Sequence, residues 1–409
     1  MEVYLTILNV LIEVYSGRNL NDVLIQYMNQ ENFPKIKNIT YGILRNYFSI
    51  NYSIDKLVKH INLQLRIILQ IGIFELKFSN KPNYAVINDL VNFSFDLIEN
   101  EKIKNFINGV LREYLRQVEQ LESEIEKDYS LKYNIPNWII TKLKKQDKAN
   151  YLNYLNGFNY HPAFGLRINL RKINQKDYLL KLDEVNLKYK LLKNKICLFK
   201  PTKVTELPLF NEGFISIQDI AAQSSIDILT KHKIKFKYVL DACSAPGGKT
   251  CQILENINCE VIALDIDETR LNKVNDNLNR LNLKAETKLG DASNKLWWNK
   301  KLFDLIIADV PCSASGTIKR NPDIKINRLE KDIINFVETQ RKIILNLWDT
   351  LSSNGFLLYI TCSIFKEENQ DNIEWLKDNL EQFKLIEQLQ IIPTEYNDSL
   401  FYALIQKGD

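Results

Sequence analysis

The sequence predicts a multidomain protein with an all-α N-terminal domain, a small α+β middle domain and a C-terminal α/β domain built on a parallel sheet. Three observations predict this division. Apolar residues recur at helical spacing in the first part of the chain, and the middle part mixes helical and alternating patterns. After Lys235, continuous apolar strands alternate with helical stretches. We therefore expect domains at residues 1–128, 129–234 and 235–409.

The N-terminal domain is predicted to be a bundle of helices. Leu5, Leu8 and Leu11 recur with the spacing of one helical face, and Gly and Pro are sparse in this part. The tripeptide Lys81-Pro82-Asn83 marks a break between two helices. In the middle domain, residues 164–169 alternate between apolar and polar positions in the manner of a strand, which together with nearby helical patches favours a small α+β domain.

The C-terminal domain carries four apolar strands, each of which runs into a polar residue. They cover residues 238–241, 261–265, 305–309 and 356–360. Continuous apolar strands are buried on both faces, which is typical of a doubly wound parallel sheet. Ligands of such sheets bind beyond the carboxyl ends of the strands. The residues that follow these strands are therefore the candidates for a functional site.

The composition excludes several classes of protein. The 409 residues carry a formal net charge of +4, which permits a nucleic-acid partner without requiring one. The six cysteines form no CxxC pair and there are only three histidines, so we expect no metal site. Free thiols fit a reducing compartment, and the N-terminus lacks a basic leader. No apolar run reaches the ~18 residues of a membrane helix, so we expect a cytoplasmic protein without a membrane partner.

The turn after the first of these strands has the character of a nucleotide-binding loop. Its small residues let the backbone pass close to a ligand, and the following helix offers free N–H groups. Asp265 ends the second strand, where an acid binds ribose hydroxyls, and Asp291 follows a further expected strand, where a carboxylate meets an adenine amino group. Neither the dinucleotide fingerprint GxGxxG nor a complete P-loop is present, so an adenosyl ligand is favoured. The loop residues expected to bind it are Cys243, Ser244, Ala245, Pro246, Gly247, Gly248 and Lys249.

Two cysteines follow the third and fourth strands. Cys312 comes after Asp309-Val310-Pro311, and Cys362 comes directly after Thr361. A thiolate that adds to carbon 6 of a cytosine makes carbon 5 nucleophilic enough to take a methyl group from a sulfonium donor. A base must then remove the proton on carbon 5 so that the thiol can leave. A carboxyl group such as Asp309 could stabilise the adduct by hydrogen bonding. Strand placement leaves the roles of the two thiols interchangeable.

These motifs resemble those of the bacterial 16S rRNA cytosine-5 methyltransferase family known as RsmB or Sun (Fmu), over nearly the whole chain. The catalytic part resembles the Nol/Nop/Sun group through DACSAPGGKT, ALDID, GDAS, DVPCSASGTIKRNPDIK and YITCSIFKEEN. The N-terminal part resembles the NusB-like RNA-binding domain through ILQIGIFEL, AVINDLVNFS and FINGVL. The resemblance implies a NusB-like helical domain, a small α+β domain and a Rossmann-like methyltransferase domain.

For the site, the resemblance implies S-adenosylmethionine as cofactor. The residues implied to bind it are those of the loop 243–249 with Asp265, Asp291 and Asp309. The resemblance also implies that Cys362 is the nucleophile, that Cys312 assists product release and that Asp309 lies where methyl donor and cytosine meet. The chain departs from the family pattern without losing a catalytic group. The departures are Ser244 in place of Ala, Val310 in place of a smaller Ala, Asn321 in place of a common His, and Asn397-Asp398-Ser399 in place of a Gly-rich turn.

The expected partner is 16S rRNA, rather than the assembled 30S subunit, bound by a monomer. Lys319, Arg320 and Lys325 follow the Cys312 loop and are expected to contact phosphates beside the target base. One alternative is a NusB-like RNA-binding protein whose enzyme domain is inactive, for which Cys362→Ala would cause no loss of function. A second is a methyltransferase that acts on tRNA or DNA. A third, a nicotinamide dehydrogenase, is disfavoured by the missing glycine fingerprint.

Overall fold

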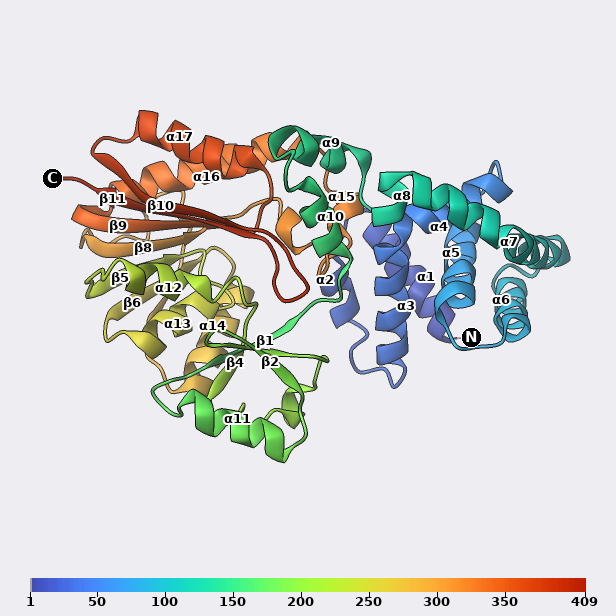
Figure 1. Cartoon of the computed structure of the whole chain (residues 1–409), viewed down its shortest axis with the longest axis horizontal. Helices are drawn as coiled ribbons and strands as arrows, with labels where there is room; N and C mark the ends of the chain where they lie inside the picture. The colour runs from blue at the N-terminus through green and yellow to red at the C-terminus, as the bar shows by residue number, and fades with distance from the viewer. Residues whose placement is uncertain (1) are drawn as a thin grey trace. The chain divides into compact units, whose positions relative to one another are not determined.

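The computed structural model describes residues 2–409, which form two compact units (Figure 1). The helical unit contains residues 2–159 and the later segment Ile318–Glu330. The sheet unit contains Tyr160–Thr317 and Lys331–Asp409. The predicted fold class, a helical N-terminal region followed by a Rossmann-like α/β region, is confirmed. The expected boundaries after residues 128 and 234 stay predictions.

The first seven helices of the helical unit pack their apolar faces around one core. The helices of the unit are α1 (Glu2–Tyr15), α2 (Leu20–Ile25), α3 (Phe33–Arg45), α4 (Tyr47–Leu57), α5 (Leu63–Phe78), α6 (Asn83–Ile98), α7 (Glu101–Lys127), α8 (Tyr129–Tyr133), α9 (Asn137–Gln146), α10 (Tyr151–Asn159) and α15 (Ile324–Asn327). Helix α5 supplies much of this core, since nearly all residues from Leu65 to Glu75 are buried. The side chains of Asn19, Asn62 and Asn100 accept backbone N–H bonds at the starts of α2, α5 and α7, which caps those helices. None of the helices in the described part of the chain is both long and apolar enough to cross a bilayer.

The segment Ile318–Glu330 is distant in sequence from the rest of the helical unit but belongs to it. Helix α15 of this segment lies against α1. The Asp323 carboxylate accepts the backbone N–H of Leu20 at 3.3 Å, and Lys325 Nζ donates to the carbonyl of Arg45 at 2.7 Å. The chain therefore leaves the sheet unit after Thr317, completes the helical unit and returns at Lys331.

The sheet unit is organised around a seven-stranded sheet of order β10-β11-β9-β8-β5-β6-β7. Its strands are β5 (Tyr238–Ala242), β6 (Glu260–Asp265), β7 (Glu286–Leu289), β8 (Phe303–Asp309), β9 (Leu351–Thr361), β10 (Phe383–Ile391) and β11 (Leu400–Lys407). The five strands from β9 to β7 in this order run parallel to one another. Strand β11 pairs antiparallel with β9 on one side and with β10 on the other. The chain passes from β5 to one side of the sheet and from β8 to the other. The carboxyl ends of β5 and β8 therefore flank a topological switch point, where ligands bind in such sheets.

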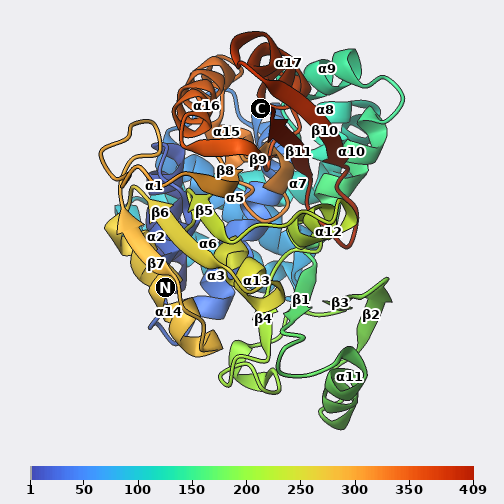
Figure 2. The same ribbon diagram turned by 90° about the vertical axis from the view of Figure 1, so that its left-hand side faces the viewer.

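Helices cover both faces of this sheet (Figure 2). These helices are α12 (Ser224–Lys231), α13 (Gly248–Asn256), α14 (Glu268–Leu281), α16 (Asp332–Trp348) and α17 (Gln370–Asn379). The helices α16 and α17 share one apolar core with the sheet, and α12, α13 and α14 share the other. Because both faces are covered, the central strands are buried along nearly all of their length, which explains their continuous apolar sequence.

A second, smaller sheet completes the sheet unit. It has the antiparallel order β2-β3-β1-β4 and packs against α11. Its elements are β1 (Phe164–Ile168), α11 (Gln175–Glu184), β2 (Tyr189–Leu192), β3 (Lys195–Leu198) and β4 (Ile215–Ile217). Arg167 of β1 forms a bidentate ion pair with Glu255 of α13, at 2.8 and 2.9 Å, and both side chains are buried. A further Arg167 N–H donates to the carbonyl of Gly248 at 2.9 Å, so this side chain ties the small sheet to the start of α13.

Candidate active site

The loop after β5 makes a tight turn into α13. Cys243 and Gly247 both have positive φ angles, of 64° and 93°. A Cβ at Gly247 would lie 3.1–3.2 Å from atoms of Val274 in α14, so the turn requires glycine for both conformation and space. The hydroxyl of Ser244 is buried and has no hydrogen-bond partner within residues 2–409. A ligand can therefore come close to the backbone of this loop. The loop also offers the Ser244 hydroxyl, which has no hydrogen-bond partner among the described residues.

Two of the predicted acids lie at the neighbouring strand ends. Asp265, at the end of β6, is 3% exposed, and its carboxylate accepts the backbone N–H groups of Ala245 and Asp267 at 3.0 and 3.1 Å. Asp265 thus holds the loop in place as well as lying beside it. Asp291, after β7, is half-buried and accepts both the N–H and the hydroxyl of Ser293 at 2.8 Å. The structure brings both acids to the same edge of the sheet as the loop.

The ion pair of Lys249 and Asp309 connects the loop to the end of β8, across the switch point. Burial alone would lower the pKa of Lys249, but the attraction of Asp309, with smaller contributions from Asp241 and Cys362, outweighs it and raises the pKa. Asp241 is completely buried; this burial raises its pKa to about 7, even though Thr250 donates to it at 2.5 Å. Lys249 is consequently held in its positively charged form by three neighbouring groups that are negative when deprotonated, namely Asp309, Asp241 and Cys362.

The two predicted cysteines lie side by side. The Sγ atoms of Cys312, after β8, and Cys362, after β9, are 3.3 Å apart, which is a hydrogen-bonding distance between free thiols. The hydrogen bond to Cys362 and burial hold the pKa of Cys312 well above its usual value, and the charge of Glu368 adds to this effect. The backbone N–H of Gly316 donates to the carbonyl of Cys362 at 2.8 Å and joins the two loops.

Glu368, which was not among the residues predicted from the sequence, also joins the two cysteine loops. Its buried carboxylate accepts the backbone N–H and the hydroxyl of Ser313 at 2.8 and 2.6 Å, the amide of Gln340 at 3.0 Å and the hydroxyl of Ser363. Ser313 follows Cys312 and Ser363 follows Cys362. Burial raises the pKa of Glu368, and the four donors oppose that shift. The signal in the sequence was a pair of acids, Glu367-Glu368, shortly after the second cysteine.

Comparison with known proteins identifies the family. Residues 228–405 match the family profile described as 16S rRNA methyltransferase RsmB/F, and residues 5–116 match the NusB family. The chain is 34% identical to the ribosomal RNA small subunit methyltransferase B of Pasteurella multocida, over 96% of this chain and 92% of the relative. The chain belongs to the RsmB/F family of 16S rRNA methyltransferases. The resemblance predicted from the motifs is confirmed.

Solved structures share the fold of this RsmB/F-family chain. A protein named PH0851 has a TM-score of 0.78 at 23% identity, over 95% of this chain and 94% of its own. The structure of NSun6 from Pyrococcus horikoshii with SFG has a TM-score of 0.59 at 19% identity, over 67% of this chain and 98% of its own.

The expected cofactor, S-adenosylmethionine, is that of the RsmB/F family, and the residues at the sheet edge fit it. Acids at the ends of β6 and β7 suit hydroxyl and amino groups, the turn at Gly247 lets a ligand approach the backbone, and Ser244 offers an unpaired hydroxyl. No group of three His, Cys, Asp or Glu side chains among residues 2–409 is arranged to hold a metal ion.

The residues predicted to contact RNA phosphates require a correction. Lys319 and Lys325 are 1% and 5% exposed, so neither presents its ammonium group on a surface. Lys325 instead bonds to Arg45 inside the helical unit. Burial, with the nearby charge of Arg45, lowers the pKa of Lys325 to about 7. Arg320 is half-buried. A lysine in a polar loop is ordinarily solvated, and here tertiary packing overrides that expectation.

Proposed function

We propose that this protein methylates carbon 5 of a cytosine in 16S rRNA through a covalent adduct with Cys362. The observation that carries the proposal is the contact of two free thiols, 3.3 Å apart, at the carboxyl ends of adjacent parallel strands. Lys249 and Asp309 lie at the same edge. Methyl transfer to an oxygen or an amino group needs no thiol, whereas the weakly nucleophilic carbon 5 of cytosine does.

In the proposed reaction, the Cys362 thiolate forms a bond to carbon 6, and carbon 5 becomes the nucleophile. Bound S-adenosylmethionine supplies an electrophilic methyl group. A base then takes the proton on carbon 5, the bond between carbon 6 and sulfur breaks, and Cys362 leaves as a thiolate. The thiol of Cys312 donates a hydrogen bond to that departing sulfur. Asp309 has one carboxylate oxygen on Lys249, and the other accepts a hydrogen bond from the amino group of the cytosine.

The electrostatics of the site support Cys362, rather than Cys312, as the attacking thiol. Lys249 interacts favourably with Cys362, and a neighbouring cation stabilises a thiolate. The pKa of Cys312 is held well above its usual value, first by the hydrogen bond to Cys362 and second by burial. The negative charge of Glu368 raises the pKa of Cys312 further, so it disfavours a thiolate there. A Cys312 thiol that stays protonated can donate the hydrogen bond that joins the two sulfur atoms, which leaves the attack to Cys362.

We assign the cofactor to the loop 243–249 with Asp265, Asp291 and Asp309. Asp291, which is half-buried, is assigned to the adenine amino group. Asp265 is assigned to the ribose side, where its bonds to the N–H groups of Ala245 and Asp267 also fix the loop. We further propose that the protein acts as a monomer in the cytoplasm and that its substrate is free 16S rRNA. The name of its relative, a ribosomal RNA small subunit methyltransferase, supports the choice of this RNA.

The test is transfer of labelled methyl groups from S-adenosylmethionine to 16S rRNA, with the modified base mapped by bisulfite sequencing. Cys362→Ala should abolish transfer. Cys312→Ala should accumulate a covalent protein–RNA adduct, visible as a shifted band on a denaturing gel. Cys259→Ala, a half-buried thiol outside the site, is the matched control and should behave as wild type. If Cys362→Ala trapped the adduct and Cys312→Ala prevented it, the roles would be reversed. Methylation of tRNA in place of 16S rRNA would refute the proposed substrate.

A further inference from the structure

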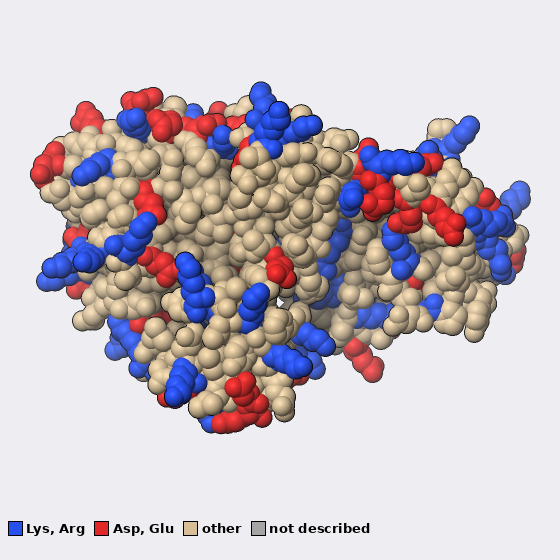
Figure 3. All heavy atoms as spheres, in the orientation of Figure 1, with Lys and Arg blue, Asp and Glu red and all other residues tan. Residues whose placement is uncertain are grey.

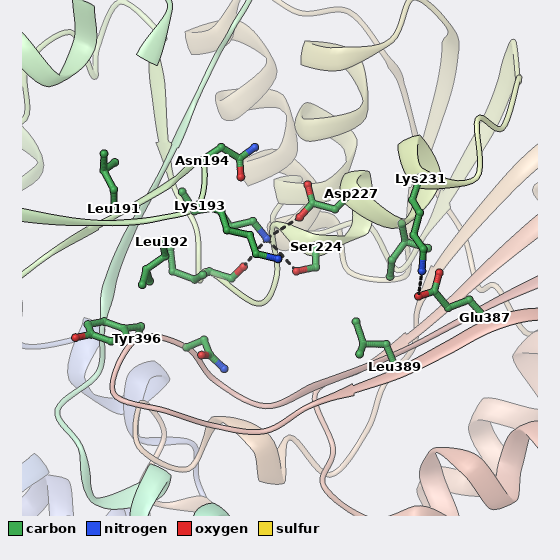
Figure 4. Close-up of a pocket in the computed structure, with 14 residues that line it drawn as sticks. Leu191, Leu192, Lys193, Asn194, Ser224, Asp227, Lys231, Glu387, Leu389 and Tyr396 are labelled. Atoms are coloured by element: carbon green, nitrogen blue, oxygen red, sulfur yellow. Dashed lines mark hydrogen bonds and ion pairs between the residues drawn. The ribbon is translucent and has the colours of Figure 1, made fainter. Parts of the chain in front are cut away.

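A cavity of about 810 Å³ opens in the sheet unit, and none of its lining residues belongs to the candidate active site. Three parts of the fold surround it (Figure 4): the turn between β2 and β3, one side of α12, and β10 with the loop that follows it. Its volume lies within the range of about 300–1,000 Å³ that is typical of ligand pockets. The cavity is therefore large enough to receive a substantial chemical group.

The acids of this cavity are already neutralised. Lys195 pairs with Asp227 at 2.8 Å, and Lys231 pairs with Glu387 at 2.7 Å. The exposed Lys193 also lines the cavity, and it has no carboxylate partner within residues 2–409. The cavity consequently has a surplus of positive charge and no unpaired carboxylate that would repel a phosphate.

The strand and turn beside the cavity extend this positive surplus. Residues 185–204 contain six lysines and no Asp or Glu. The five exposed ones are Lys188, Lys190, Lys193, Lys200 and Lys203. Elsewhere, on the face drawn in Figure 3, basic and acidic side chains are interspersed. The surplus is therefore a local property of this stretch, since the whole chain has a net charge of only +4.

The cavity also has exposed apolar walls. Leu191 and Leu389 are 43% and 38% exposed, although both are large and apolar. Tyr396 lies across from the β2–β3 turn, and the ammonium group of Lys190 lies 4.3 Å from its ring centroid and donates to its hydroxyl at 2.6 Å. Basic side chains next to aromatic and aliphatic surfaces are what single-stranded nucleic acids bind, with phosphates on the former and bases on the latter.

The walls of the cavity are hydrogen-bonded to the cysteine loops. Gln390, which follows Leu389 on β10, donates to the hydroxyl of Ser399 at 3.0 Å. The backbone N–H of Ser399 donates to the carbonyl of Gly316 at 3.1 Å, and Gly316 donates in turn to the carbonyl of Cys362 at 2.8 Å. The wall and the loop of the proposed nucleophile are thus parts of one bonded structure.

We propose that this cavity binds a single-stranded segment of the RNA substrate next to the target cytosine. Lys190 and Lys193 contact its phosphates, and Tyr396, Leu191 and Leu389 contact a base. The proposal rests on the proposed function, since it assumes that the substrate is RNA. A protein partner would use the same leucines, but the local surplus of lysines favours a polyanion.

The experiment compares two double variants of the full-length protein. Lys190→Gln with Lys193→Gln removes Lys193, which lines the cavity and has no carboxylate partner within residues 2–409, and Lys190, which contacts Tyr396 at its wall. Lys176→Gln with Lys342→Gln removes two exposed cations on α11 and α16 as the matched control. RNA affinity is measured with a fluorescent 16S rRNA fragment at several salt concentrations. Each lost phosphate contact should reduce the slope of log affinity against log salt by about 0.7. We expect the cavity variant to lose about 1.4 in slope and roughly tenfold in affinity, and the control variant to lose neither.

Steady-state kinetics and cross-linking complete the test. The cavity variant should raise KM for RNA and leave kcat and S-adenosylmethionine affinity unchanged. RNA that carries 4-thiouridine beside the target should cross-link to the β2–β3 turn or to Tyr396 in the wild type. The proposal would be overturned if the two double variants had equal effects, or if the cross-links were confined to other segments. It would also be overturned if the cavity bound a protein partner and the cavity variant kept the RNA affinity of the wild type. Failure of the proposed function is distinct, because the wild type would then not methylate 16S rRNA at all.

Discussion

Replacing Arg167 by Met should destabilise the sheet unit by about 3–5 kcal/mol, because it leaves the carboxylate of Glu255 buried without its partner. The magnitude follows from the geometry. The side chains of Arg167 and Glu255 are 7% and 1% exposed, and two N–H groups of the guanidinium bond the carboxylate at 2.8 and 2.9 Å. The variant also loses the bond from Arg167 to the carbonyl of Gly248, at the start of α13, which adds about 1 kcal/mol.

The double variant Arg167→Met with Glu255→Leu separates these effects. Replacing both partners of a buried ion pair by apolar residues removes the stranded charge, so it should recover most of the loss. Urea unfolding followed by tryptophan fluorescence is a suitable assay, because four of the five tryptophans lie in the sheet unit. A loss below about 1 kcal/mol in the single variant, or a double variant no more stable than the single one, would refute the reasoning.

Three further predictions concern buried groups. Glu368→Gln leaves one acceptor oxygen for four donors, so methyl transfer should fall at least roughly tenfold while the affinity for S-adenosylmethionine, measured by calorimetry, stays unchanged. Hydrogen peroxide should oxidise the thiols of Cys312 and Cys362, which are 3.3 Å apart, to a disulfide with release of two waters. Mass spectrometry should find that bridge, and activity should return with dithiothreitol; loss of activity without a bridge would contradict this. Lys325 has its pKa lowered to about 7 by burial, so protonation favours the unfolded state and stability should rise by about 2 kcal/mol from pH 7 to pH 9. Thermal unfolding of Lys325→Met should lack that increase.

The sequence predicted the parts of the site that lie next to a strand. Each buried parallel strand is a continuous apolar run, so its carboxyl end, and hence Asp265, Asp309, Cys312 and Cys362, could be located without coordinates. The edge strand β10 was missed because its half-exposed residues do not follow a regular alternation. The contact of the two thiols depends on the pairing of β8 with β9, which no local pattern encodes.

Other parts depended on partners far away in the chain. Glu368 bonds to Ser313, 55 residues earlier, so its role was hidden in an ordinary-looking acid pair. Lys325 was predicted to contact RNA phosphates because it follows the Cys312 loop, and the helical unit buries it. Nothing in the composition of Ile318–Glu330 indicates that this segment joins helices made long before it.

That segment sets an order of events during synthesis on the ribosome. When Asn159 has emerged, the helical unit still lacks α15, and it must wait until β5, β6, β7 and β8 have been translated before Asp323 can reach Leu20. A fragment that ends at residue 159 would leave Leu20 and Arg45 without the partners that Asp323 and Lys325 provide. The helical unit is therefore finished by a piece of chain that the ribosome makes only after the first cysteine loop, so neither unit can be excised from the gene as one continuous stretch.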